Sequence, residues 1–205
     1  MPALRYPPVR AIGLMVLAAN HLILTGCGTT SPLQLSDSSQ AIDLTPYTRL
    51  LIEDFADEAT SKVKPEFQPL LQPKMTQAVK LFPDQIASVT RAGGGFEEVL
   101  REGPADATTL IVRGAITQFD EGNATLRWIV GFNAGNANFD ARLELVDGAS
   151  GEQLGTWLVD KNSWALGGGI AATQRPEDFM AEAAAKIGNE LSTKRKQGSI
   201  AKPAR

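Results

Sequence analysis

Few side chains in this 205-residue chain could do chemistry, and two of them lie near its start. Cys27 is the only cysteine and His21 is the only histidine. A lone cysteine is most often a small buried hydrophobe, so that interpretation competes with a chemical role for the Cys27 sulfur. The sequence around Cys27, LILTGCGTT, favours the chemical role, because it directly follows an apolar run.

The residues before Cys27 have the layout of a secretory signal. Arg5 and Arg10 make the first ten residues basic, and the mostly apolar run AIGLMVLAANHLIL follows over residues 11–24. A basic segment followed by an apolar segment of this length is typical of a signal peptide. The run is shorter than the ~20 residues that a membrane-spanning helix needs. The sequence therefore predicts export.

The tetrad that closes the run, Leu24-Thr25-Gly26-Cys27, resembles the bacterial lipobox, in which an aliphatic residue, a small residue and Gly or Ala precede Cys. The resemblance implies that the Cys27 sulfur receives a diacylglyceryl group, that residues 1–26 are removed as a signal peptide, and that the new amino group is acylated as well. Several acyl chains give stable anchoring where a single chain is marginal. Gly28, rather than Asp, follows the cysteine, which resembles the outer-membrane pattern of Gram-negative lipoproteins. We therefore expect a lipid-anchored protein of the cell envelope, at the outer membrane and facing the periplasm.

The predicted mature chain has few groups for catalysis. His21 would leave with the signal and Cys27 would be acylated, which excludes histidine bases, cysteine nucleophiles and the usual Cys/His zinc sites. Adjacent acids such as Glu53-Asp54 point to opposite faces of a strand and cannot form a carboxylate pair there. We therefore expect no catalytic residue, no metal site and no cofactor. The net charge of −3, which falls further when two arginines are removed, argues against a nucleic-acid partner.

The predicted domain organisation has four parts. Residues 1–26 are the signal peptide, residues 27–41 are the acylated cysteine and a flexible tether, residues 42–198 are one globular domain, and residues 199–205 are a disordered tail. The tether prediction depends on the Ser- and Thr-rich stretch GTTSPLQLSDSSQ, with a reach of about 20 Å. The alternative is a short packed segment that uses Leu33 and Leu35.

Hydrophobic periodicity predicts an α/β (α+β) fold with a single mixed or mainly antiparallel sheet and two or three helices on one face. An apolar stripe predicts a helix over residues 66–89, which Pro83 should kink or split. A second helix is expected from Pro176 to a glycine cap at Gly198. Strands are expected at residues 49–55, 96–101, 109–119, 124–130, 138–146 and 153–160.

The segment from Leu110 to Leu154 resembles a family of bacterial lipoproteins known only as domain of unknown function 4410. The matching features are Arg113-Gly114, the turn at residues 119–123, Arg127, the small-residue cluster at residues 131–137 and the turn at residues 147–151. The likeness extends over about residues 49–191. The resemblance implies a lipoprotein but carries no activity and no catalytic residue.

Two groups of residues are candidates for partner contact. Arg127, Trp128 and Trp157 could form an exposed aromatic and cationic patch, although packing of the indoles in the core or at an edge is an equal alternative. Gly131 and Gly135 in GFNAGNA are interpreted as a structural glycine cluster that allows close packing, with a backbone-exposing binding loop as the alternative.

The function expected from the sequence is tethering. An acylated domain would act as a non-catalytic binding or assembly module near the membrane, with an envelope protein or a cell-wall component as its partner. The oligomeric state stays open, and a structural role through self-assembly is a further option. The alternative from another class is a carboxylate-dependent hydrolase that acts on an envelope polymer.

Overall fold

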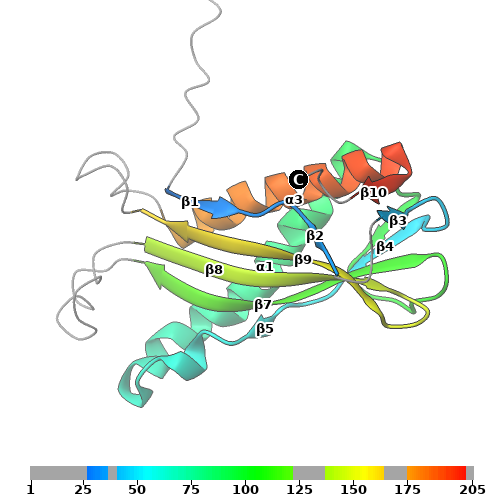
Figure 1. The fold of residues 1–205 in the computed structure, drawn as a ribbon. Helices are drawn as coiled ribbons and strands as arrows, with labels where there is room; N and C mark the ends of the chain where they lie inside the picture. The colour runs from blue at the N-terminus through cyan, green and yellow to red at the C-terminus, as the bar shows by residue number, and fades with distance from the viewer. Residues whose placement is uncertain (1–26, 37–40, 122–136, 164–174, 202–205) are drawn as a thin grey trace, which may run out of the picture.

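The computed structural model describes residues 27–36, 41–121, 137–163 and 175–201. Within them the chain forms a mixed eight-stranded sheet and two long helices (Figure 1). The strand order is β1-β9-β8-β7-β4-β6, and β2 and β5 pair with β9 and β7. The strands of this sheet are β1 (Cys27–Thr30), β2 (Gln34–Leu35), β4 (Arg49–Ile52), β5 (Ala56–Asp57), β6 (Glu98–Leu100), β7 (Thr109–Glu121), β8 (Ala137–Asp147) and β9 (Gln153–Asn162).

The α/β class with a mixed sheet agrees with the prediction, but the sheet is larger than expected. The long strands β7, β8 and β9 form an antiparallel meander, while β4 pairs in parallel with both β6 and β7. A second, two-stranded sheet pairs β3 (Ala41–Asp43) with β10 (Ser199–Ala201). The prediction of a single sheet is therefore wrong, because strands from both ends of the chain were not foreseen.

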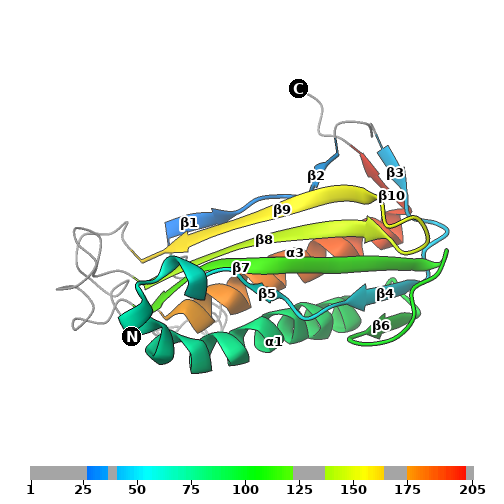
Figure 2. The ribbon, with the colours of Figure 1, turned by 90° about the horizontal axis from the view of Figure 1, so that it is seen from below.

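The burial pattern of strand β8 shows which face of the sheet is covered. Its alternating pattern, predicted from the sequence, is confirmed: Phe139, Ala141, Leu143 and Leu145 are at most 3% exposed, and the residues between them are half-buried or exposed. Alternate side chains of a strand point to opposite faces, so one face of the sheet carries the core. The helices α1 (Gln68–Gly93) and α3 (Pro176–Gln197) pack together on that face (Figure 2).

Helix α1 runs unbroken through Pro83, so of the two predicted effects of this proline, a kink or a split, the split is wrong. Pro83 is buried and lies beside Phe82, which packs edge-to-face against Phe55 and Phe139 in the core. Two short 3₁₀ helices, η1 (Thr60–Lys62) and η2 (Pro65–Phe67), precede α1. The free energy gained by packing the apolar stripe of α1 thus exceeds the cost of the hydrogen bond that Pro83, which has no backbone N–H, cannot make.

Both predicted ends of helix α3 are confirmed. It begins at Pro176 with Glu177 and Asp178 in its first turn, and Gly198 ends it with a left-handed φ of 76°. None of the helices in the described ranges is long and apolar enough to cross a membrane.

The C-terminal residues do not behave as predicted. Residues 199–201 form β10, and Ile200, only 3% exposed, pairs with Ile42 of β3. The prediction of a disordered tail from residue 199 is therefore wrong for these three residues. Two apolar side chains, one from each end of the domain, provide the packing that neither segment shows alone. Residues 202–205 lie outside the described residues.

Candidate functional site

The segment that follows Cys27 forms the edge of the main sheet. Strand β1 is antiparallel to β9, with Cys27 opposite Asn162, and β2 pairs further along the same strand. Between them, the Ser31 backbone N–H donates to the Leu158 carbonyl at 2.8 Å. The predicted flexible tether is thus wrong for residues 28–36, because their backbone groups pair with β9. The alternative that used Leu33 and Leu35 is correct: Leu33 is 6% exposed, and both pack on the core.

Gly28 has a structural reason to be glycine. Its φ of 119° is in the region that residues with a side chain rarely adopt. A Cβ atom there would lie 2.2 Å from the carbonyl oxygen of Asp160. The close approach of β1 to β9 therefore requires glycine immediately after Cys27.

A row of polar side chains on α3 holds this N-terminal edge. Glu182, Lys186 and Glu190 are spaced four residues apart, so they lie along one side of the helix. Both carboxylate oxygens of Glu190 accept from the Leu33 backbone N–H, at 3.1 and 3.2 Å. The Lys186 ammonium group donates to the Thr30 carbonyl. We call these three residues the α3 polar row.

The α3 polar row also satisfies two polar groups of β9. Glu190 accepts a hydrogen bond of 2.9 Å from the indole N–H of Trp157, and Glu182 pairs with the ammonium of Lys161 at 3.0 Å. Trp157 is fully buried and Lys161 is only 8% exposed. Buried donors without acceptors are costly, so the row stabilises β9 as well as the strands at its edge.

The structure describes one of the three predicted contact residues, Trp157. Trp157 has no exposed surface and packs in the core, so it cannot belong to an exposed patch. The indole N–H donates to Glu190 of α3, and this hydrogen bond allows full burial of the large Trp157 side chain. Arg127, Trp128, Gly131 and Gly135 lie outside the described residues. The sequence reasoning missed Glu190, whose only signal was its spacing from Glu182 and Lys186.

The face of the sheet opposite the helices is polar and carries a pair of acids. Asp140 of β8 lies directly opposite Asp160 of β9 in the register. Burial and the neighbouring Asp160 charge raise the pKa of Asp140 from 3.8 to about 6, although the Lys161 backbone N–H and the Lys62 charge act in the opposite direction. Facing residues of an antiparallel pair have Cβ atoms about 5 Å apart, so one of these carboxyls holds its proton to a higher pH than usual.

We expect Asp140→Asn to stabilise the protein at pH 8 by about 1 kcal/mol and to change little at pH 3.5. The folded-state pKa is about 6, so the folded protein keeps a proton that the unfolded chain loses above pH 3.8. Stability is therefore lost as the pH rises between these two values, and the uncharged amide avoids that loss. The small figure allows for solvent screening of a half-buried side chain.

Urea denaturation of both proteins at the two pH values measures this effect. Asp160→Asn is the matched variant, because it removes the neighbouring charge and leaves Asp140 in place; we expect a gain of the same sign and smaller size. An equal change of stability at pH 3.5 and pH 8 would contradict the explanation by charge.

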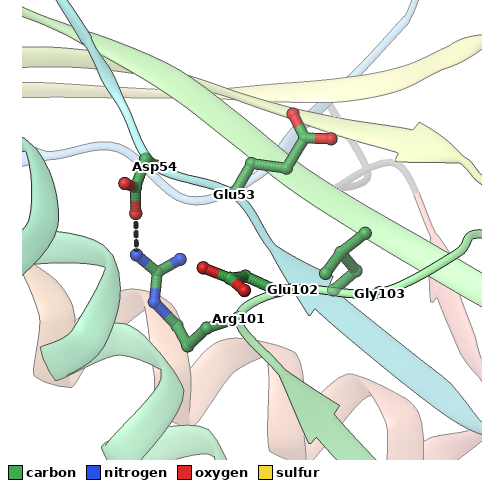
Figure 3. Close-up of a pocket in the computed structure, with 6 residues that line it drawn as sticks. Glu53, Asp54, Arg101, Glu102 and Gly103 are labelled. Carbon is green, nitrogen blue, oxygen red and sulfur yellow. Dashed lines mark hydrogen bonds and ion pairs between the residues drawn. The ribbon is translucent and has the colours of Figure 1, made fainter.

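A shallow hollow of about 350 Å³ lies at the carboxyl end of β4, lined by Leu51, Glu53, Asp54, Arg101, Glu102 and Gly103. The Arg101 guanidinium donates to Asp84 of α1 at 2.7 Å, to Asp54 and to the Ile52 carbonyl. Asp54 reaches the guanidinium, whereas Glu53 points away from it (Figure 3). These two adjacent acids point in different directions, but they lie beyond Ile52, the last residue of β4, and not on a strand as predicted. Arg101 therefore joins helix, strand and loop, and its donors are already engaged within the chain.

No group of three or more His, Cys, Asp or Glu residues suited to a metal ion occurs in the described part of the chain. In the hollow, Asp54 pairs with Arg101, and on the open face Glu144 pairs with Arg113. The arrangement offers a polar sheet face and a fixed N-terminal edge rather than a set of converging ligands.

These features define a class: an α/β domain with two helices on one face of a mixed sheet and an N-terminal edge strand that begins at its single cysteine. The particular family follows from sequence comparison. The chain belongs to the family described as domain of unknown function (DUF4410), whose model matches residues 50–167. No curated protein matches the chain.

Solved structures resemble this chain at low sequence identity. The PelC dodecamer from Paraburkholderia phytofirmans matches in two crystal forms, with TM-scores of 0.52 and 0.51 and 14% identity, covering 81% of this chain and 98% of PelC. A protein from Xanthomonas campestris with a DUF330 family model has a TM-score of 0.43 and 9% identity, covering 74% of this chain and 88% of that one. At such identities the PelC match shows the fold alone.

Proposed function

We propose that this protein is an envelope lipoprotein, anchored through acyl groups on Cys27 at the outer membrane and facing the periplasm, and that it acts there as a non-catalytic binding or assembly module. The lipobox tetrad and the preceding signal-like segment support the anchor. Anchoring confines the domain to a thin layer beside the membrane, which raises its effective concentration for partners in the same layer.

One observation carries the proposal. The lipobox places the mature N-terminus at Cys27, and strand β1 begins at the same residue. The two boundaries come from independent sources, a four-residue motif and the pairing of β1 with β9. A mature chain that begins at Cys27 would keep every residue of β1.

The proposed partner is another envelope protein or a cell-wall component. A partner protein could also be a second copy of this chain. The PelC structures are dodecamers, and a shared fold makes self-assembly worth testing without establishing it. Among the described residues, the main sheet ends at β1 on one side and at the three-residue strand β6 on the other. Unpaired edges are where additional strands can dock. Crosslinking in intact cells, followed by identification of the captured species, distinguishes self-assembly from capture of another protein.

Mass spectrometry of the protein purified from its native membrane tests the anchor. We expect the N-terminal residue to be Cys27, carrying a diacylglyceryl group on sulfur and a further acyl group on nitrogen. An intact Met1 terminus, or an unmodified side chain at position 27, would overturn the proposal. Either result is visible in the intact mass and in the N-terminal peptide.

A hydrolase that acts on an envelope polymer remains the second candidate, and one observation favours it. Asp140, with its pKa near 6, and Asp160 are paired acids of the kind that divide proton donor and base roles. The hollow described above lies elsewhere, around Arg101. Release of reducing sugars from purified cell-wall glycans, abolished by Asp140→Asn, would favour this function over binding.

A further inference from the structure

The end of the main sheet that carries Cys27 can be traced by register. Cys27 lies opposite Asn162, Asn162 lies opposite Asn138, and Asn138 lies opposite Asp120, so one row crosses β1, β9, β8 and β7. The next residue of β7, Glu121, forms an ion pair with Lys74 of α1. The first turns of α1 therefore lie at the same end of the molecule as Cys27, and both ribbon views agree (Figures 1 and 2).

An exposed apolar and basic segment forms part of this end. Leu70, in the first turn of α1, is 65% exposed, and is one of two large exposed hydrophobics in the described chain. Val63 and Phe67 are half-buried and do not belong to the core cluster. Lys62, Lys64 and Lys74 are exposed, although the Lys62 ammonium donates to the Thr117 carbonyl and Lys74 pairs with Glu121. Glu66 is the acid within the segment, and the first turn of α1 has no acid. We call residues 62–74 the Leu70 segment.

We propose that the Leu70 segment rests on the surface of the lipid bilayer when Cys27 is acylated. This inference depends on the proposed anchor. Because β1 begins at Cys27 and pairs at once with β9, no flexible spacer separates the acyl chains from the sheet. The end of the sheet is therefore drawn to the membrane, and the Leu70 segment comes with it.

The chemistry of the Leu70 segment suits an interfacial position. An exposed leucine beside a half-buried phenylalanine suits the boundary between headgroups and acyl chains, and lysine stems can lie along that boundary with their ammonium groups in water. The segment lies next to β7, three strands away from β1. Two separated contacts, the acyl chains and Leu70, would fix the long axis of the sheet relative to the membrane.

The second exposed leucine provides a matched control. Leu158 is 49% exposed, but it lies on β9 opposite Arg142, on the open face and away from the row at the sheet end. The test uses the full-length, natively acylated protein carrying Leu70→Cys or Leu158→Cys. Each new thiol is labelled with a polarity-sensitive fluorophore, because the Cys27 sulfur is blocked by its lipid. The labelled proteins are reconstituted into phosphatidylethanolamine–phosphatidylglycerol vesicles with or without doxyl-labelled lipid.

At position 70 we expect blue-shifted emission and quenching by doxyl lipid about twofold stronger than at position 158. Vesicle flotation, measured on the same samples, reports the anchor separately. Flotation with equal quenching at both positions would overturn this inference and leave the anchor intact, whereas absence of flotation would overturn both. A blue shift at position 70 that increases with protein density and is insensitive to doxyl lipid would identify a second copy of the chain, and would also overturn the inference.

Discussion

Under the proposed anchoring, substitution of Cys27 by serine is expected to remove nearly all of the protein from the membrane fraction. A serine side chain has no sulfur, so it cannot form the thioether that would carry the diacylglyceryl group. Each buried methylene of an acyl chain contributes about 0.8 kcal/mol to membrane binding, so loss of several chains removes stable anchoring. The variant should accumulate either in the soluble fraction or as a precursor that retains residues 1–26, and fractionation with immunoblotting distinguishes these forms.

The neighbouring exposed residue provides the control for this substitution. Thr29→Ser changes a side chain of β1 two residues away and leaves the motif complete, so it should be processed and retained like the parent protein. Normal processing and unchanged membrane retention of Cys27→Ser would reject the anchor assignment.

Glu190→Ala is expected to lower the free energy of unfolding by about 2–4 kcal/mol. The substitution removes the acceptor of two donors at once, the indole N–H of the fully buried Trp157 and the backbone N–H of Leu33. For a domain of this size, such a loss corresponds to a decrease of about 10 °C in Tm. Thermal denaturation gives the global effect. Hydrogen exchange should show faster exchange at residues 28–36 than in the parent protein, because the N-terminal edge loses a contact with α3.

Two variants separate the hydrogen bonds from general damage to the helix. Glu190→Gln keeps a carbonyl oxygen that can accept from one donor, so its loss of stability should be smaller. Asn189→Ala alters the adjacent exposed position and should have almost no effect. Equal destabilisation by Glu190→Gln and Glu190→Ala would mean that the acceptor is not what stabilises this edge.

The central fold was predictable because its signals are local. Strands β7 and β8 and helix α3 each carry their own hydrophobic period and their own turn or cap residues. The edges were not predictable for the opposite reason. Residues 28–36 have no clear period, and their partner, β9, lies more than a hundred residues further along the chain. Composition alone suggested a flexible tether, although backbone pairing needs no particular side chain.

The candidate site was predicted less well than the fold. Trp157 was an ambiguous residue in the sequence, since an indole can serve equally in a core or in a contact surface. The deciding group, Glu190, lies on another element, and only the packing of α3 against β9 brings the two together. The role of Cys27 stays a prediction, which depends only on the residues immediately around it in the sequence.

The length of β7 and the positions of β1 and β10 determine how far the domain extends from the end that carries Cys27. Thirteen residues of strand extend about 40 Å, and β10 lies at the opposite end of the molecule from β1 (Figure 1). Under the proposed anchoring of Cys27, β10 would lie about 40 Å from the bilayer surface. A reporter fused beyond Ala201 should therefore be accessible to large periplasmic ligands without disturbing the lipid-bearing end.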